Sequence, residues 1–393
     1  MRTLYLQHAR ILVEISLGAL LLSTLHDDSN AADWMTSARA SELSSPSFRG
    51  IGDLPGGSFH SEALAISDDG MVVAGRSSSA QFEEEGLVVT GDTLIALLGQ
   101  AGMPVSSEPR ALTANGGIIA GKIVSMARLE AARWTAATGW VGLGDIDGGQ
   151  FGSQALGISG DGTILVGWGT SSLGFEAARW INGTAIAMGD LPGGIYNSAA
   201  ALVSEDGRTI VGTGTSAQGP QVFVWKESTG MLGLGDLVGG AFSSEPFGMT
   251  PDASVIVGEA TSNLGIEAFR WTELEGMIAL GDLQGGIHQS IAFDVSADGS
   301  VIVGYGSTAQ GPEAFVWDAE LGMRNLKEVL VASGVSAVEG WLLTEATGIS
   351  ADGSVVIGNG TNPNGQTEGW VSRIPNVTAI QRKTWTTVRE AYR

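Results

Sequence analysis

The chain has 393 residues, a formal net charge of −22 and no cysteine. A surface this acidic repels nucleic acid and anionic lipid, so neither is an expected partner. Without cysteine there are no disulfides and no thiolate metal sites, and stability has to come from the packed core.

Residues 1–31 carry the features of a signal peptide. Arg2 and Arg10 come before an apolar stretch at residues 15–25, and residues 29–31 are small enough for a cleavage site. The alternative is an N-terminal helix of the mature protein, because the apolar stretch is too short to span a bilayer. We expect a secreted, periplasmic or cell-surface protein with no transmembrane segment in its mature chain.

We expect a linker over residues 32–48. From residue 49 to residue 374, a unit of about 46 residues occurs seven times. A full copy contains Gly-Asp-Leu-Pro-Gly-Gly, an apolar stretch, Ser-x-Asp-Gly, and Glu-Ala-Phe-Arg-Trp. The third residue of the Ser-x-Asp-Gly element falls at Asp69, Asn115, Asp161, Asp206, Asp252, Asp298 and Asp352. Units this short cannot bury their own apolar faces, so they must stack on one another, and this period with four strand-like runs per copy predicts a β-propeller.

Within the third copy the apolar runs predict strands over residues 154–159, 163–170, 175–181 and 184–191. The dipeptide Asp161-Gly162 between the first two runs accommodates the positive φ angles of a tight hairpin.

The number of strands suggests how the ring closes. The first three strand types occur seven times, but the fourth occurs only six times between them, and residues 49–54 supply a seventh copy at the N-terminus. The sequence therefore predicts an all-β, seven-bladed propeller of four-stranded antiparallel blades, in which an N-terminal strand completes the last blade and leaves no open edge. The last copy is stretched by an insertion around residues 331–342.

A tryptophan ends the third strand of six copies, at Trp134, Trp180, Trp225, Trp271, Trp317 and Trp370. In three copies a phenylalanine stands two residues earlier, on the same face of the strand. We interpret this pair as packing between blades, since buried aromatic rings dominate core energetics; the alternative is an aromatic platform for sugars.

The repeated unit resembles the HAF repeat of predicted extracellular bacterial proteins. The resemblance rests on Leu-Gly-Asp-Leu-Pro-Gly-Gly, Ala-x-Gly-Ile-Ser-x-Asp-Gly, Val-Gly and x-Ala-Phe-x-Trp, with glutamate in place of the histidine, as at Glu267 and Glu313. It covers about residues 50–374 and implies an exported or surface-displayed protein of unassigned activity. Some members carry sorting segments at the C-terminus, whereas residues 375–393 here form a short basic polar tail.

No catalytic, metal or cofactor site is indicated by the motifs. The histidines His8, His26, His60 and His288 are isolated, and no nucleophile or metal-ligand spacing emerges. The Asp-Gly turns offer one or two acids each, which favours plain hairpins over calcium sites, because calcium needs six to eight oxygens. We therefore expect no metal and no cofactor.

A ring or imidazole recurs just after Gly-Gly in five copies. These candidate ligand-binding residues are Phe59, Phe151, Tyr196, Phe242 and His288. They could circle one face of the propeller near its axis, where propellers commonly bind ligands. The alternative is that each ring caps its own blade.

The sequence thus favours a non-catalytic secreted or surface propeller, a monomer that binds a glycan or a surface protein. The alternative is a secreted carbohydrate-active hydrolase or lyase with carboxylates at the propeller channel.

Overall fold

The computed structural model describes residues 45–125 and 128–375. The chain divides into two units, Met1–Ser45 and Pro46–Arg393, and only the second is described below. The expected signal peptide (1–31), most of the expected linker (32–48) and nearly all of the basic tail (375–393) lie outside the described residues. Within the described ranges, no helix combines the length and the apolar character needed to cross a membrane.

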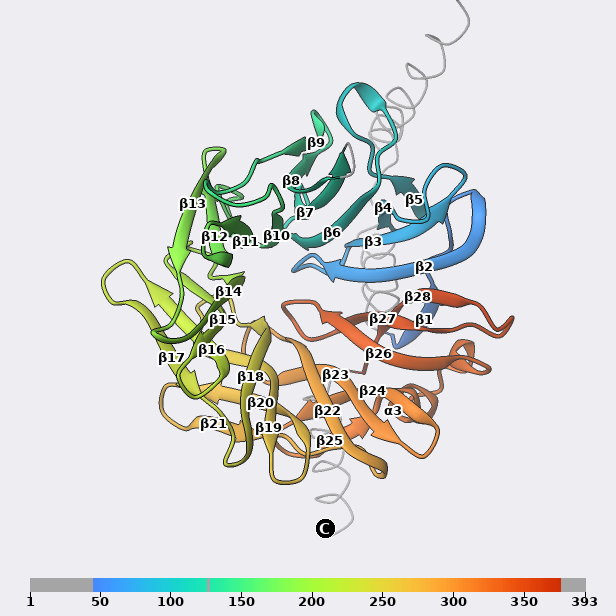
Figure 1. Ribbon diagram of the computed structural model, residues 1–393. Helices are drawn as coiled ribbons and strands as arrows, with labels where there is room; N and C mark the ends of the chain where they lie inside the picture. Colours follow the sequence, from blue (N-terminus) through green and yellow to red (C-terminus); the bar gives the residue numbers. More distant parts are fainter. Residues whose placement is uncertain (1–44, 126–127, 376–393) are drawn as a thin grey trace, which may run out of the picture. The chain divides into compact units, whose positions relative to one another are not determined.

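Four-stranded antiparallel sheets make up most of the described chain (Figure 1). One sheet contains β2 (Gly56–Ile66), β3 (Val72–Ser79), β4 (Glu85–Thr90) and β5 (Thr93–Ala96). The next contains β6 (Ser107–Leu112), β7 (Ile118–Ser125), β8 (Arg128–Thr135) and β9 (Gly139–Gly142). It is followed by β10 (Gln154–Ile158), β11 (Ile164–Ser171), β12 (Gly174–Ile181) and β13 (Thr184–Gly189). A further sheet contains β14 (Gly193–Val203), β15 (Thr209–Ser216), β16 (Pro220–Lys226) and β17 (Gly230–Gly235).

Two more sets of four strands belong to one eight-stranded sheet, in which a single bridge between Ile266 and Gln289 joins them. The first set is β18 (Gly239–Met249), β19 (Val255–Ser262), β20 (Ile266–Thr272) and β21 (Gly276–Ala279). The second is β22 (Gly285–Val295), β23 (Val301–Thr308), β24 (Gly311–Asp318) and β25 (Gly322–Asn325). The last sheet contains β26 (Leu342–Ile349), β27 (Val355–Thr361), β28 (Thr367–Arg373) and the N-terminal strand β1 (Ser47–Gly50).

The strands of the third copy follow the apolar runs of the sequence. β10, β11, β12 and β13 each begin and end within two residues of the expected bounds, so these predictions are confirmed. At the hairpin, Gly162 has a φ of 71°, and the carboxylate of Asp161 accepts hydrogen bonds from the Ser159 hydroxyl at 2.7 Å and the Thr163 N–H at 3.0 Å. The repeated Ser-x-Asp-Gly element is thus a turn held by its own side chains.

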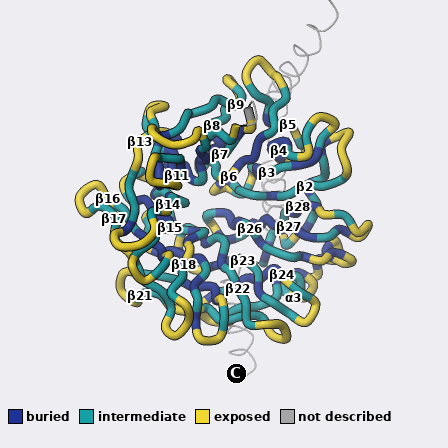
Figure 2. Tube along the Cα trace, in the orientation of Figure 1, coloured by how far each residue is buried: buried dark blue, intermediate teal, exposed yellow. Residues whose placement is uncertain are grey.

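Apolar contacts join each sheet to the next. The first strand of every sheet lies against the first three strands of the sheet before it, and β2 lies in the same way against β26, β27 and β28. Phe223, for example, packs in one cluster with Val166 and Leu191 of the preceding sheet, and Trp225 covers that cluster. Figure 2 shows buried residues within the sheets and exposed residues in the connecting loops. The repeated sheets form a β-propeller, as the sequence predicts, and the Phe-x-Trp pair serves packing.

Buried polar contacts also hold neighbouring sheets together. In the Gly-Asp-Leu element, Asp190 accepts hydrogen bonds from the N–H groups of Leu191 (2.7 Å), Thr215 (2.9 Å) and Asn197 (2.8 Å). Ser198 donates to the Gly189 carbonyl at 2.6 Å and accepts from the Ala177 N–H of the preceding sheet at 2.9 Å. The same serine contacts recur at Ser153, Ser244 and Ser290. These motif residues are therefore structural, since each satisfies backbone groups between strands.

The stretched last copy contains a helix that the repeat pattern does not predict. α3 (Leu326–Ala332) begins at Asn325, whose side chain accepts from the Glu328 N–H, and its Leu326 and Leu330 are buried. The short 3-10 turn η2 (Ser336–Val338) follows; another, η1 (Gln100–Gly102), precedes β6.

Near η2, Phe48 of β1 packs against Trp341 and Trp370, with ring centroids 5.1 and 5.8 Å apart. β1 pairs antiparallel with β28 from Ser47 to Gly50, so the strand begins two residues before the expected start of the repeat.

Deleting residues 47–54 should lower stability by several kcal/mol or cause aggregation, because it exposes the edge of β28 and empties the Phe48 position. Deleting residues 376–393 should change the unfolding midpoint little. Thermal unfolding of both deletions beside the full chain tests this. Equal midpoints for the two deletions would contradict it.

Candidate functional site

A cavity of about 450 Å³ lies at the centre of the ring of sheets. Its walls come from the first strand of each sheet, namely β2, β6, β10, β14, β18, β22 and β26. Most of the lining residues are apolar, Leu64, Leu156, Phe247 and Phe293 among them, but polar atoms form a similar share of the wall surface. Such a partly apolar, concave space with a few polar groups is where a ligand is expected to bind.

Two structurally equivalent rows of side chains lie on the first and second strands of the sheets and differ from copy to copy. The first row, on the first strands, contains Glu62, Glu108, Gln154, Ala199, Glu245, Ile291 and Glu345. The second row, on the second strands directly opposite, contains Arg76, Lys122, Trp168, Thr213, Glu259, Tyr305 and Asn359. Gln154 and Glu245 line the cavity itself, together with Arg110. We refer to the two rows and Arg110 as the channel mouth.

The neighbouring positions are nearly invariant among the copies, and the structure explains why. A glycine precedes every member of the second row, and a Cβ added at Gly75 or Gly304 would lie 2.0 or 1.9 Å from a carbonyl oxygen of the first strand. Packing therefore fixes the glycine. It leaves the next side chain free to vary, so the channel mouth is where the copies carry different chemistry.

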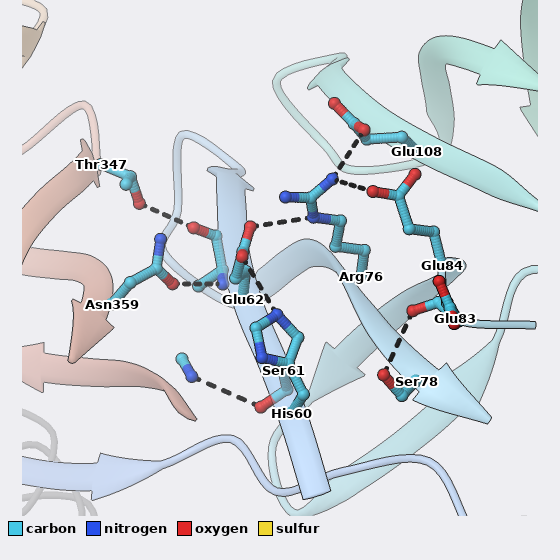
Figure 3. Close-up of polar contacts among 12 residues, drawn as sticks. His60, Ser61, Glu62, Arg76, Ser78, Glu83, Glu84, Glu108, Thr347 and Asn359 are labelled. Atoms are coloured by element: carbon cyan, nitrogen blue, oxygen red, sulfur yellow. Dashed lines mark hydrogen bonds and ion pairs between the residues drawn. The ribbon is translucent and has the colours of Figure 1, made fainter. Parts of the chain in front are cut away.

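On one side of the channel mouth, opposite charges pair (Figure 3). Arg76 bonds Glu62 at 2.8 Å, Glu84 at 2.7 Å and Glu108 at 2.9 Å, so one guanidinium joins three carboxylates. Glu108 also contacts Lys122 at 2.8 Å and pairs with Arg110. On this side the positive and negative side chains neutralise one another.

Ionisation in this cluster follows from those contacts. The side chain of Glu108 is only 1% exposed, and burial alone would raise its pKa. Arg110, Lys122 and Arg76 outweigh that effect and hold the pKa of Glu108 below its usual value. Burial likewise opposes the charge of Arg76, but Glu62, Glu108 and Glu84 keep its pKa raised. Both groups are ionised at neutral pH.

The opposite side carries carboxylates without counterions. Glu245 of β18 stands directly opposite Glu259 of β19, and among the described residues no hydrogen bond or ion pair reaches either carboxylate. Glu345 accepts only a neutral hydrogen bond, from the Asn359 amide at 2.8 Å. Burial raises the pKa of all three, and the charge of Glu245 adds to the rise at Glu259. Glu245 still reaches the open cavity, so solvent screens part of this effect.

Aromatic rings lie beside these acids. Phe247 and Phe293, which line the cavity, meet edge to face with centroids 5.5 Å apart. Phe293 continues to Tyr305 at 5.9 Å, and the Tyr305 hydroxyl accepts a hydrogen bond from Gln289 at 3.1 Å. Gln154 of β10 is 8% exposed, and its amide nitrogen has no partner among the described residues. A buried polar atom without a partner costs free energy.

Asp294 also lines the cavity, on β22 and three residues after Ile291 of the first row. Its carboxylate accepts hydrogen bonds from the N–H groups of Val295 and Ile349, each at 2.8 Å. Part of the residue borders the cavity, but protein surrounds the carboxylate, and this burial raises its pKa to about 7 despite both bonds.

The five rings expected from the sequence are not among the residues that line the cavity. Tyr196 hydrogen-bonds with Glu176 of the preceding sheet, and His288 lies 3.0 Å from Glu267, also in the preceding sheet. Phe151 is 40% exposed, with the Arg128 guanidinium 5.7 Å from its ring centroid. Phe59 and Phe242 are half-buried. The contacts of Tyr196 and His288 fit a capping role, and a ligand-binding role for the five rings stays a prediction.

The repeated glutamate of the third strand has a structural use as well. Glu176 accepts from the Gly189 N–H at 3.0 Å, and Glu130 and Glu368 accept in the same way from Gly144 and Gly52. Within residues 45–125 and 128–375, no group of three or more histidines and acids is arranged to hold a metal ion.

Sequence reasoning did not identify the channel mouth, although a signal for it exists. Aligning the copies shows that the residue after Val-Gly or Ala-Gly and the residue before the buried Ala or Pro of the first strand vary most in charge. What the sequence does not show is that these two positions are cross-strand partners beside a cavity.

Comparisons with known proteins support the fold alone. No protein-family model matches the sequence, and no curated protein matches it. Oligogalacturonate lyase in complex with manganese is similar in structure, with a TM-score of 0.53, 12% identity, and 84% of this chain and 97% of that chain covered. An oligogalacturonate lyase from Vibrio parahaemolyticus gives a TM-score of 0.53 with 10% identity and the same coverages. TolB from Acinetobacter baumannii gives 0.43 with 12% identity, and the match covers 66% of this chain and 61% of that one.

Replacing Tyr196 tests the capping role of the rings. Tyr196→Phe should cost about 1 kcal/mol through the lost hydrogen bond, whereas Tyr196→Ala should cost roughly 2–4 kcal/mol because it also removes a packed ring. Phenylalanine occupies the equivalent position in three other copies, so the first variant should fold. Denaturant unfolding measures both. An alanine variant as stable as the wild type would contradict the capping role. Tyr196 would then be a candidate for ligand binding instead.

Asp294 should make stability depend on pH. Its pKa is about 7 in the folded state against a reference of 3.8, so between pH 4 and 7 the folded state holds a proton that the unfolded state has lost. Its contribution to the free energy of unfolding therefore falls as the pH rises through this window, by up to roughly 4 kcal/mol.

Asp294→Asn removes the titration and keeps one acceptor. The difference in unfolding free energy between wild type and this variant, measured from pH 4 to pH 8, should shrink as pH rises. A difference that stays constant across the range would contradict the raised pKa.

Proposed function

We propose that the protein is a seven-bladed propeller closed by β1, and that it acts as a non-catalytic binding module with a glycan ligand at the channel mouth. The pairing of β1 with β28 and the contacts of β2 with the last sheet support the closure. The signal-like residues 1–31 and the resemblance to the HAF repeat support export to the periplasm, cell surface or medium.

One observation carries the binding function. The copies keep the residues that packing requires, such as the glycine before each second-row residue, but at the channel mouth they carry acids, bases, an amide and aromatic rings. A mouth needed only to close the ring would be expected to repeat one packed residue, as the buried alanine or proline after each first-row residue does. Chemical variety confined to a cavity edge is typical of a binding site.

The polar and aromatic groups suit a hydroxyl-rich ligand. Glu245 and the unsatisfied amide of Gln154 are polar groups on two different sheets around the cavity, and Phe247 and Phe293 offer apolar ring surface in the same cavity. Sugars combine hydroxyl edges with apolar C–H faces, so they match both kinds of group.

A second candidate function is a carbohydrate hydrolase or lyase. Glu245 and Glu259 are cross-strand partners with raised pKa values, which is how one carboxyl of an acid/base pair stays protonated near neutral pH. The structurally similar proteins named above are oligogalacturonate lyases, and this suggests uronate polymers as trial substrates.

A screen of glycans and cell-wall polymers should separate the two functions if it measures binding and released product together. We expect binding without product. Gln154→Leu and Phe247→Ala should each weaken binding at least tenfold, because each removes a contact group from the cavity wall. Product that disappears in Glu245→Gln would replace this proposal by the enzymatic one.

Phe151→Ala serves as the matched control, since it removes an exposed ring that does not line the cavity. It should leave binding unchanged. Binding that depends on Phe151 and not on Gln154 or Phe247 would move the ligand to the face formed by the five rings.

A further inference from the structure

The charges of the channel mouth do not balance. Its cations Arg76, Arg110 and Lys122 all bond acids on one side, where Glu62, Glu84 and Glu108 already neutralise them. The acids that remain have no counterion among the described residues: Glu245 and Glu259 of one sheet, and Glu345 of the sheet that adjoins Glu62. An anionic ligand would find no free cation here, whereas a cationic one would find three carboxylates.

The pairing of the first and second strands shows that this excess of negative charge is unusual. In two sheets the equivalent cross-strand pairs carry opposite charges, Glu62 with Arg76 and Glu108 with Lys122. In a third sheet the pair is Glu245 with Glu259, and like charges directly opposite one another destabilise a sheet. A bound cation would remove that repulsion, because both carboxylates could contact it.

Aromatic surface lies next to the same acids. Phe247 and Phe293 line the cavity beside Glu245, and Tyr305 continues the row. The faces of aromatic rings attract cations, most strongly where water is excluded. Carboxylates together with ring faces form a site suited to an ammonium group.

A further observation, independent of the acids, indicates an oxygen on the same ligand. Gln154 lines the same cavity from β10, is 8% exposed, and has an amide nitrogen without a partner among the described residues. Leaving a buried donor unpaired costs free energy, so a ligand that supplies an acceptor here gains affinity. A hydroxyl oxygen would satisfy it, whereas a simple alkylammonium ion would not.

We propose that the channel mouth selects an amino sugar, a unit that carries an ammonium group beside hydroxyls, as in a de-N-acetylated polysaccharide. This inference rests on the proposed glycan binding and names the class of glycan. The ammonium group lies between Glu245 and Glu259 against the aromatic rings, and a hydroxyl faces Gln154. The cavity of about 450 Å³ falls in the size range of small-molecule sites.

The test compares three soluble oligosaccharides of equal length, titrated into the full-length protein at pH 6. They are β-1,4-linked glucosamine, its N-acetylated form, and the unsubstituted glucose oligomer. The glucosamine oligomer should bind at least tenfold more tightly than the other two, and added salt should reduce the difference, because it screens charge. Glu245→Gln and Glu259→Gln should each remove most of the preference, whereas Gln154→Leu should weaken all three oligomers.

Glu273→Gln is the matched control, because it makes the same charge change at an exposed position outside the channel mouth, and Glu273 forms no ion pair with any residue that the structure describes. It should leave the preference intact. Glu245→Gln relieves repulsion, so its unfolding midpoint should not fall below that of the wild type.

Equal affinity for the three oligomers would overturn the amine preference and leave glycan binding standing. Binding of none of them, with binding of a neutral or acidic glycan in the wider screen, would also overturn only this inference. Binding of a lysine-rich peptide and of no glycan would overturn both proposals.

Discussion

A half-buried aspartate in the Gly-Asp-Leu element ties the end of one sheet to the start of the next. Asp190 holds three backbone N–H groups from the connecting loop, from the first strand of the next sheet and from that sheet's second strand. Asp236 and Asp282 bind their loops and first strands in the same way. Because a four-stranded sheet cannot bury both faces by itself, the position of each sheet relative to its neighbour decides whether the core forms at all. Where the element is present, this aspartate sets the direction in which the next sheet begins and so supports the apolar packing.

Few positions in each copy are free for function, because most recurring residues are needed for backbone hydrogen bonds or for packing. Serine, aspartate, glutamate and glycine recur because backbone groups need them, and the apolar residues recur because neighbouring sheets meet through them. The two rows of the channel mouth do not meet either demand in every copy: Gln154 and Glu245 line the cavity, whereas Asn359 accepts a hydrogen bond from the Ala63 N–H of the adjoining sheet. Variation there costs the fold little, which is why a repetitive chain can carry a site that is different in every copy.

The sequence reveals the repeat because packing is periodic, and it reveals strands such as β10 to β13 because turn chemistry at Asp161-Gly162 is local. It does not reveal α3, since the helix fills a place left by one irregular copy and is stabilised by Leu326 and Leu330 in the core next to β1. It also points to the recurrent rings rather than to the channel mouth. Recurrence marks what packing needs, whereas a site built from differences, such as Glu245 opposite Glu259, has no period to detect.

The unfavourable pair at the channel mouth is tolerable because stability in a repeat protein is spread over many similar interfaces. Each interface buries apolar residues such as Val211, Ile256 and Phe269 completely, and no interface relies on the charge of Glu245 or Glu259. A like-charged pair that includes Glu245, a buried carboxylate at Asp294 and an unsatisfied amide at Gln154 all belong to residues around the same cavity. Several energetically unfavourable groups therefore lie around one cavity. A ligand that relieves these unfavourable interactions explains this distribution.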